Sequence, residues 1–142
     1  MDIAKLEQEA ENGSAVAQTI LGTCYLDGIE VKRDYTKAFG LLRSAAEQRA
    51  SRAVTNLARM YAEGLGTAKN FPEALRLYEA AADAGEFLAQ IELGRMYSQG
   101  IGTAVDREKA LSWYRAAAAQ ENVVSDCEEL REAKAFIKGR GR

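Results

Sequence analysis

RMYAEGLGTA occupies residues Arg59–Ala68, and RMYSQGIGTA occupies residues Arg95–Ala104. Seven of the ten positions are identical, and the second stretch begins 36 residues after the first. When the comparison is extended to Arg59–Ala82 against Arg95–Ala118, 13 of 24 positions are identical. Self-similarity at a fixed interval of this length is the signature of a helical repeat protein. The sequence therefore predicts a repeating two-helix unit.

An earlier copy of the unit obeys the same interval of 36 residues. Five kinds of position recur at this spacing: a leucine, a tyrosine, a glycine, a single alanine and an alanine pair. They are Leu21, Leu57 and Leu93; Tyr25, Tyr61 and Tyr97; Gly28, Gly64 and Gly100; Ala38, Ala74 and Ala110; and Ala45-Ala46, Ala81-Ala82 and Ala117-Ala118. We expect one repeat domain over residues 1–142, with full units at 14–49, 50–85 and 86–121.

The first helix of each unit is predicted from its apolar spacing. In the second unit, Ala53, Leu57, Met60 and Tyr61 follow the spacing of one helical face over Ser51–Glu63. Gly64 comes directly after this stretch, and a glycine in the left-handed conformation commonly ends a helix. The first helix should therefore stop at the repeated glycine.

The second helix of the unit is predicted from its N-terminal signals. Asn70 stands at the N-cap position, and Glu73 three residues later suggests a capping box. Asp34 and Asp106 hold the same place in the other units. Pro72, the single proline, falls in the first helical turn, where its missing N–H is not needed.

Small residues in the first helices indicate how the helices pack. Gly22, Ala58 and Gly94 share one column in the middle of the first helix. A glycine there costs about 1 kcal/mol relative to alanine. We therefore expect a close helix crossing at this column. Tyr78, Tyr114, Trp113 and Leu41 are expected to fill the space between helix layers.

The residues outside the three units are interpreted as caps. Residues 1–13 fit the pattern of a lone second helix, which would cap the first unit. Residues 122–137 are expected to form a C-terminal capping helix with a polar outer face, because they carry the apolar stripe Val123, Cys127, Leu130 and Ile137. The spacing slips by one here, since Leu130 follows Leu93 by 37 positions. Residues 138–142, KGRGR, are expected to be a frayed tail, with a basic docking motif as the alternative.

The composition excludes several function classes. The formal net charge of −2 gives no electrostatic basis for binding nucleic acid or an anionic membrane. The absence of histidine removes both the commonest general base and the commonest zinc ligand. Cys24 and Cys127 are expected to be buried free thiols. The N-terminal residues are acidic and no long apolar stretch is present, so we expect a cytoplasmic protein.

No motif in the sequence predicts catalysis. Gly64-x-Gly66 and Gly100-x-Gly102 join two helices, whereas a phosphate-binding loop follows a strand. No G-x-S-x-G is present, and no histidine could activate a nucleophile. Glu128 and Glu129 lie on a helix face predicted to be solvated. We expect no catalytic residue, no metal and no cofactor.

The third unit carries a longer pattern. It reads A-x3-LG-x2-Y-x2-G-x-G, then a loop, an aspartate and KA-x2-WY-x2-AA. In this sequence its residues are Ala89, Leu93-Gly94, Tyr97, Gly100, Gly102, Asp106, Lys109-Ala110, Trp113-Tyr114 and Ala117-Ala118. The pattern resembles the SEL-one-like repeat family, a relative of the tetratricopeptide repeats. The first unit departs at Glu30, where the others have Gly66 and Gly102, so its loop is expected to bend differently.

The resemblance implies a fold and a function. It implies an all-α, right-handed solenoid of stacked helix-turn-helix units, with a concave face lined by the first helices. It also implies a non-enzymatic adaptor or scaffold, of bacterial type, that holds a protein or peptide. The alternatives are a dedicated inhibitor or immunity-type protein and, from another class, a hydrolase. We expect a monomer, with self-association through the solenoid ends as the alternative.

Three columns of first-helix residues are expected to face the groove. Their members in the second and third units, which we take as the candidate binding residues, are Arg52, Thr55, Arg59, Leu88, Ile91 and Arg95. Arginine suits capture of a carboxylate, and the sequence shows no carboxylate in these columns. The groove is therefore predicted to bind an acidic or C-terminal peptide segment with apolar side chains. The alternative is that these arginines are solvated or pair with neighbours such as Glu63.

Overall fold

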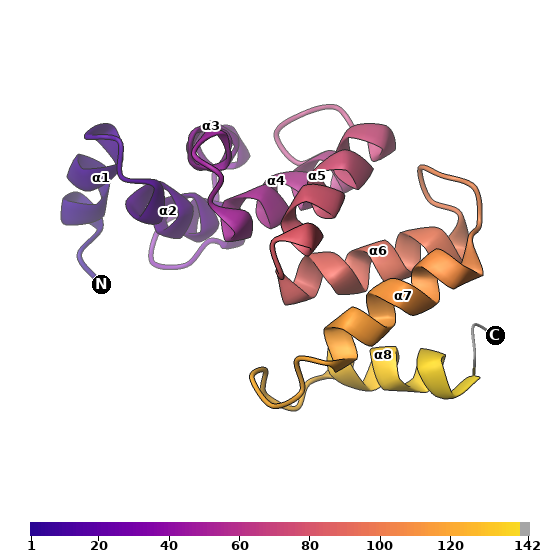
Figure 1. Ribbon diagram of the computed structural model, residues 1–142. Coiled ribbons are helices and arrows are strands. Elements are labelled where there is room, and N and C mark those ends of the chain that lie inside the picture. The colour runs from indigo at the N-terminus through magenta and orange to yellow at the C-terminus, as the bar shows by residue number, and fades with distance from the viewer. Residues whose placement is uncertain (140–142) are drawn as a thin grey trace. The chain divides into compact units, whose positions relative to one another are not determined.

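The computed structural model describes residues 1–139, and these residues form eight α-helices and no strand (Figure 1). The helices are α1 (Ile3–Glu11), α2 (Ala15–Asp27), α3 (Tyr35–Glu47), α4 (Ser51–Glu63), α5 (Phe71–Asp83), α6 (Phe87–Gln99), α7 (Arg107–Ala118) and α8 (Glu128–Gly139). The predicted all-α repeat fold is confirmed.

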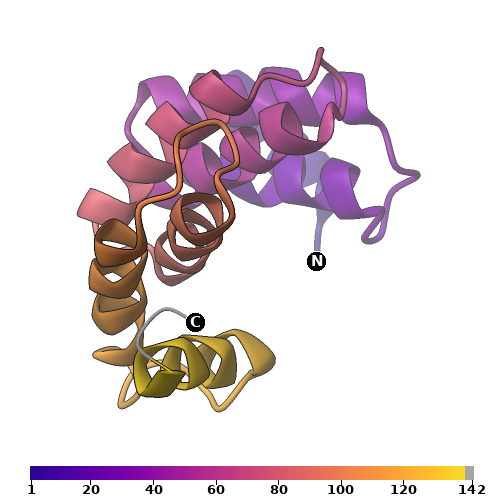
Figure 2. The same ribbon diagram turned by 90° about the vertical axis from the view of Figure 1, so that its right-hand side faces the viewer.

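The chain divides into two compact units, Met1–Leu77 and Tyr78–Arg142, and α5 spans the division. In the first unit, α2 packs against α1, α3 and α4, and α3 packs against α4. In the second unit, α6 packs against α7, and α8 packs against both. Figure 2 shows α8 lying beside α7, as in Figure 1. Consecutive helices therefore pair, and alternate helices also touch.

The repeated glycines end the first helices as predicted. Helix α4 ends at Glu63, and Gly64 follows with φ 69°, in the left-handed region. Gly28 and Gly100 end α2 and α6 with φ 69° and 70°. Each of these glycines donates its N–H to a carbonyl of the last helical turn, which satisfies an acceptor that the helix end leaves open.

The predicted N-caps of the second helices are confirmed. Of the two hydrogen bonds that a capping box predicts for Asn70 and Glu73, only the one accepted by the Asn70 side chain is present. The side-chain oxygens of Asp34, Asn70 and Asp106 each accept a backbone N–H three residues on, at 3.0 Å. The reciprocal bond from Glu73 is not made. The Glu73 carboxylate instead accepts hydrogen bonds from Arg76, and the Asn70 N–H donates to the Tyr61 carbonyl at 2.8 Å.

Gly22 and Gly94 mark the close helix crossings that the sequence predicts. A Cβ at Gly22 would lie 2.8 Å from Cγ of Leu42 on α3. A Cβ at Gly94 would lie 2.7 Å from the ring of Tyr114 on α7. Real Cβ atoms essentially never come so close, so packing requires glycine at these two positions.

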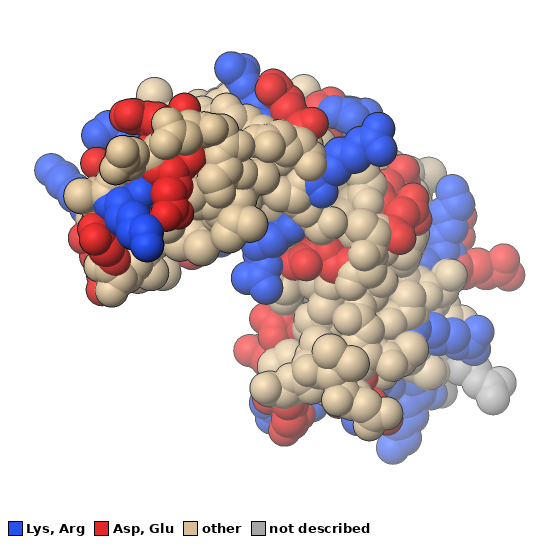
Figure 3. Space-filling view, turned by 60° about the vertical axis from the view of Figure 1, so that its left-hand side comes forward, with Lys and Arg blue, Asp and Glu red and all other residues tan. Residues whose placement is uncertain are grey.

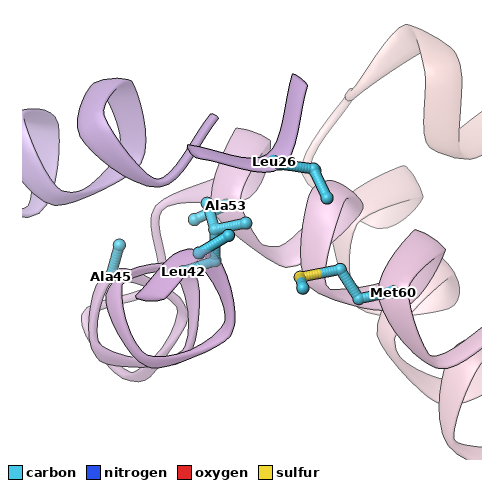
Figure 4. Close-up of a cluster of buried hydrophobic side chains, with 6 residues drawn as sticks. Leu26, Leu42, Ala45, Ala53 and Met60 are labelled. Carbon is cyan, nitrogen blue, oxygen red and sulfur yellow. The ribbon is translucent and has the colours of Figure 1, made fainter. Parts of the chain in front are cut away.

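Each unit has its own apolar core. In the first unit, one cluster consists of Leu26, Ala38, Leu42, Ala45, Ala53 and Met60, contributed by α2, α3 and α4 (Figure 4). In the second unit, Ile91, Tyr114, Ala117 and Ala133 join α6, α7 and α8. Tyr78 and Tyr114 are buried as predicted, whereas Trp113 and Leu41 are only half-buried.

The first loop bends like the others, contrary to expectation. Glu30 has φ 60°, close to the 69° of Gly66 and the 72° of Gly102 at the equivalent positions. Arg49 similarly has φ 64°, at a position where another unit has Gly85. These two residues hold a backbone conformation that disfavours side chains, because a left-handed Cβ approaches the following carbonyl oxygen.

The C-terminal segment differs from its prediction. The last helix begins at Glu128 rather than at residue 122, and Val123 lies in a turn with 86% of its surface exposed. Leu130 is buried as the stripe predicts. Cys24 is a buried free thiol, but the free thiol of Cys127 is only half-buried. Residues 140–142 of the predicted tail lie outside the described residues.

Candidate partner-binding surface

In the first unit, α2 and α4 lie side by side and are joined by polar contacts. Nδ2 of Asn56 donates to Oγ1 of Thr23 at 3.0 Å. Nη2 of Arg59 lies 3.4 Å from Oδ1 of Asp27. Because Asn56 pairs with Thr23 and Arg59 pairs with Asp27, the two helices run parallel and in register. We name the exposed side of this helix pair the α2–α4 face.

Arg59 is bound to two carboxylates. Its Nε donates to Glu63 on the same helix at 2.9 Å, in addition to the contact with Asp27. Burial lowers the pKa of Arg59, but the hydrogen bond to Glu63 and the charges of Glu63 and Asp27 raise the pKa more. The alternative that the arginines pair with neighbours such as Glu63 is therefore seen for Arg59, although the predicted columns themselves hold no carboxylate.

The other predicted residues of α4 differ in accessibility. Arg52 is exposed. Thr55 is 4% exposed, and its hydroxyl donates to the backbone carbonyl of Ser51 at 3.1 Å. Since Thr55 is buried and its hydroxyl bonds within its own helix, it is not available to a partner.

Two apolar side chains stand exposed on α2. Val16 is 71% exposed and Ile20 is 38% exposed, and they are one helical turn apart. Val16 belongs to a predicted column, but Ile20 and the acceptor Asp27 were not predicted. The turn spacing of Val16, Ile20 and Asp27 along α2 could have identified them, since they share one side of a helix with Thr23.

In the second unit, Arg95 is also bound to carboxylates. Its Nε and Nη2 donate to the carboxylate of Glu132 on α8, at 2.8 and 2.6 Å, and its Nη1 donates to Glu92 at 2.5 Å. The Tyr114 hydroxyl donates to the same Glu132 at 2.8 Å. Arg95 therefore joins α6 to α8, and Tyr114 adds α7 to this network.

The environment of Glu132 favours its charged form. Burial raises the pKa of Glu132, but the hydrogen bonds from Arg95 and Tyr114 and the charge of Arg95 lower it more. The net pKa lies below the ordinary value of a glutamate. Burial and the hydrogen bond to Glu132 raise the pKa of Tyr114. The network is thus held with an ionised Glu132 and a neutral tyrosine at neutral pH.

Ile91 and Leu88 on α6 have opposite surroundings. Ile91 is 0% exposed, because it packs with Tyr114 and Ala117 of α7 and Ala133 of α8. This predicted contact residue cannot touch a partner in this structure. Leu88 is 41% exposed and remains accessible.

The six predicted residues therefore fall into two sets. Arg52, Thr55 and Arg59 lie on α4 in the first unit, and Leu88, Ile91 and Arg95 lie on α6 in the second. Acidic and basic side chains are intermixed on the face drawn in Figure 3, without a large area of one sign. Of the three predicted arginines, Arg59 and Arg95 are thus accompanied by carboxylates.

No group of three or more Cys, Asp or Glu side chains within residues 1–139 is placed to hold a metal ion. No helix of this part of the chain is both long and apolar enough to cross a membrane. The α2–α4 face carries the exposed apolar residues Val16 and Ile20 on one helix and the exposed Arg52 on the other.

Comparison with known proteins connects this geometry to a family. The profile described as Sel1 repeat matches residues 15–49, 51–86 and 88–122. A comparison with curated protein sequences found no significant match.

Two solved bacterial structures resemble the chain. A Sel1 repeat protein from Oxalobacter formigenes is 38% identical, with a TM-score of 0.79 over 97% of this chain and 98% of that one. A protective antigen present in uropathogenic Escherichia coli strains, which displays an SLR fold, is 34% identical, with a TM-score of 0.85 over 99% of this chain. The chain spans 30% of that antigen's length.

Proposed function

We propose, from the premise that this chain belongs to the Sel1 repeat family, that it is a non-enzymatic scaffold which binds a protein or peptide on the α2–α4 face. Proteins of this family generally mediate protein–protein interaction, and the family is typically non-catalytic. Helices α2 and α4 are first helices of their repeats, and the family resemblance implies that first helices line the concave face.

The observation that carries this proposal is the pair of exposed apolar side chains beside cations. Val16 and Ile20 expose 71% and 38% of their surfaces, although burial of apolar surface is favourable. Arg52 lies one turn before Asn56, and Ile20 lies about one turn before Thr23, which pairs with Asn56. In two parallel helices in register, Arg52 and Ile20 therefore lie at the same level. A partner could cover the apolar pair and meet a cation at once.

The partner proposed is a segment with acidic and apolar side chains. Arginines of this column already take carboxylate ligands from the chain itself: Arg59 binds Glu63 and Asp27, and Arg95 binds Glu132. A carboxylate from a partner would compete with Asp27 and Glu63, which are exposed and hold Arg59 weakly.

An affinity capture from host lysate followed by calorimetry tests the proposal. Two double variants test the charged and the apolar contacts separately. Arg52→Glu/Arg59→Glu reverses the charge of the two arginines, and Val16→Asp/Ile20→Asp removes the apolar pair. Lys5→Glu/Lys32→Glu makes the same change in net charge at exposed positions away from the face. We expect both face variants, verified as folded by circular dichroism, to lose the partner that wild type and control retain. Retention by all four proteins would refute the α2–α4 face.

The affinity for the captured partner separates two roles. A micromolar, salt-sensitive dissociation constant is expected for an adaptor, whereas a dedicated inhibitor needs a nanomolar value and a large interface. We also propose a cytoplasmic monomer, because both cysteines are free and disulfides are rare in the cytosol. Sedimentation at two protein concentrations tests the monomeric state.

A further inference from the structure

A hollow of about 530 Å³ lies in the first unit between α1 and α3, with α2 as its floor. Glu7 and Glu11 line it from α1, Lys37 and Gly40 from α3, and Tyr25 of α2 and Leu41 of α3 provide aromatic and aliphatic surface. None of these residues belongs to the α2–α4 face. We name this cavity the α1–α3 hollow.

Gly40 is the unexplained residue of this hollow. Glycine destabilises the interior of a helix relative to alanine, and Gly40 lies in the middle of α3. At Gly22 the packing against Leu42 explains the glycine, but a Cβ at Gly40 would meet nothing within 4 Å. The equivalent positions of the other units hold Arg76 and Ser112. The internal packing of the chain does not require Gly40, whereas an incoming backbone would benefit from its missing side chain.

The rim formed by α1 is acidic. Glu7 and Glu11 are one turn apart and both are exposed. Glu7 accepts a hydrogen bond from the Tyr25 hydroxyl at 3.1 Å, and within residues 1–139 no cation pairs with Glu11. Two carboxylates at this spacing repel each other mildly, and a shared cation would relieve the repulsion.

The floor already accommodates one cation. Nζ of Lys37 lies 5.2 Å from the centroid of the Tyr25 ring, a distance suited to cation–π attraction. Lys37 thus lies over the ring from the α3 rim, while the α1 carboxylates on the other rim have no cationic partner within residues 1–139. Leu41, half-buried beside Gly40, offers apolar contact.

We propose that the α1–α3 hollow is a second docking surface, which takes a basic and apolar segment of a partner protein. An arginine of that segment lies between Glu7 and Glu11, since a guanidinium can donate to two carboxylates. An apolar side chain covers Leu41, and the backbone of the segment passes over Gly40. The charge of this surface selects a partner opposite to the acidic one proposed for the α2–α4 face.

The test is an NMR titration of the ¹⁵N-labelled full chain with two short peptides. The basic probe is Ac-Leu-Arg-Leu-Arg-NH2, and the matched acidic probe is Ac-Leu-Glu-Leu-Glu-NH2. We expect the basic probe to shift the amide signals of Tyr25, Gly40 and Leu41, and the acidic probe to leave them unchanged. Equal shifts with both probes, or shifts that avoid the hollow, would overturn the proposal.

Matched variants locate the binding. Gly40→Arg places the side chain of the equivalent Arg76 over the hollow and should weaken basic-probe binding about tenfold or more. Gly40→Ala, whose Cβ meets nothing within the chain itself, should weaken it by a smaller factor than Gly40→Arg. Glu7→Gln/Glu11→Gln should weaken it, and Arg52→Glu/Arg59→Glu should not. Unchanged binding by Gly40→Arg would refute the site, and so would concentration-dependent shifts without probe, which indicate a second copy of the chain.

Discussion

The guanidinium of Arg95 on α6 holds the carboxylate of Glu132 on α8 in a fork, with Nε 2.8 Å from Oε2 and Nη2 2.6 Å from Oε1. The two residues are 37 positions apart, one more than the repeat interval. Because the last helix slips by one position, Glu132 rather than Arg131 meets Arg95. A register of 36 would have placed two arginines together. The slip thus replaces the repulsion between Arg95 and Arg131 with an ion pair between Arg95 and Glu132.

Replacement of this carboxylate should loosen the last helix. Glu132→Gln keeps the shape but removes the charge that Arg95 binds, and we expect a loss of about 1–2 kcal/mol in the free energy of unfolding. Urea denaturation measures the loss, and hydrogen exchange should show it first in α8. Glu128→Gln, at an exposed position of the same helix, is the control. If both variants lose the same stability, the fork contributes nothing specific.

The same residue predicts a dependence of stability on acid pH. The pKa of Glu132 is lowered in the folded chain by Arg95 and Tyr114, against the opposing effect of burial. Its stabilisation is therefore complete above the unfolded value of about 4.5 and is lost as pH falls through the folded pKa. The free energy of unfolding, measured by denaturation between pH 7 and pH 3, should fall with this loss. In Glu132→Gln the free energy of unfolding should depend less on pH. An unchanged slope in the variant would mean that other carboxylates account for it.

Glycine at two strained positions should stabilise the chain. Glu30 and Arg49 have φ 60° and 64°. Relief of the left-handed strain outweighs the extra chain entropy of glycine, so Glu30→Gly and Arg49→Gly should each add about 0.5–1 kcal/mol. Thermal unfolding measures the gain. Lys32→Gly, close to Glu30 but without a left-handed φ, should not stabilise.

The equivalent position in the second unit should respond in the opposite direction. A Cβ at Gly66 would lie 2.7 Å from the carbonyl oxygen of Tyr35. Gly66→Ala combines this collision with left-handed strain and should cost about 2–4 kcal/mol. Chemical denaturation tests this value. A mild effect of Gly66→Ala would show that the loop can move away from Tyr35.

Two mid-helix glycines form a matched pair for stability. Gly22→Ala drives a Cβ to 2.8 Å from Leu42 and should destabilise by about 1–3 kcal/mol. Gly40→Ala meets nothing and should stabilise by about 0.5–1 kcal/mol through helix propensity. Circular dichroism melts of the two variants report the opposite shifts. A destabilised Gly40→Ala would indicate a packing role that the structure does not show.

Much of the fold could be predicted from residues close together in the chain. The bounds of α4, the left-handed Gly64 and the N-caps Asp34 and Asp106 agree with their predictions, because each depends on one helical turn. The predicted hydrogen bond from the Asn70 N–H to the Glu73 side chain was wrong, because Arg76, one turn away on the same helix, competes for the Glu73 carboxylate. The bend at Glu30 was wrong because the fold imposes the left-handed loop on whatever residue stands there.

Side-chain roles at the candidate site were harder to predict. Ile91 and Thr55 were predicted to face a partner. Instead, Ile91 packs against side chains of α7 and α8, and the Thr55 hydroxyl donates to a carbonyl of its own helix. A glutamine network was missed as well: the buried Gln18 and the exposed Gln48 bond to each other and to the Ala10 and Gly13 carbonyls. Gln90 and Gln120, 72 positions later, repeat this network, so a search at twice the repeat interval could have found it.

The sequence alone determines the repeat, its period and the helix ends within the repeats that were predicted from caps and glycines, since these features depend on residues close together in the chain. It also determines the family, because the columns of small and aromatic residues recur with the period. Which arginines meet carboxylates, which apolar residues stay exposed and where Gly40 opens a hollow were decided only by the tertiary structure. The reason is physical: these properties depend on side chains 18 to 37 positions apart, brought together by helix packing and by the one-residue slip before α8.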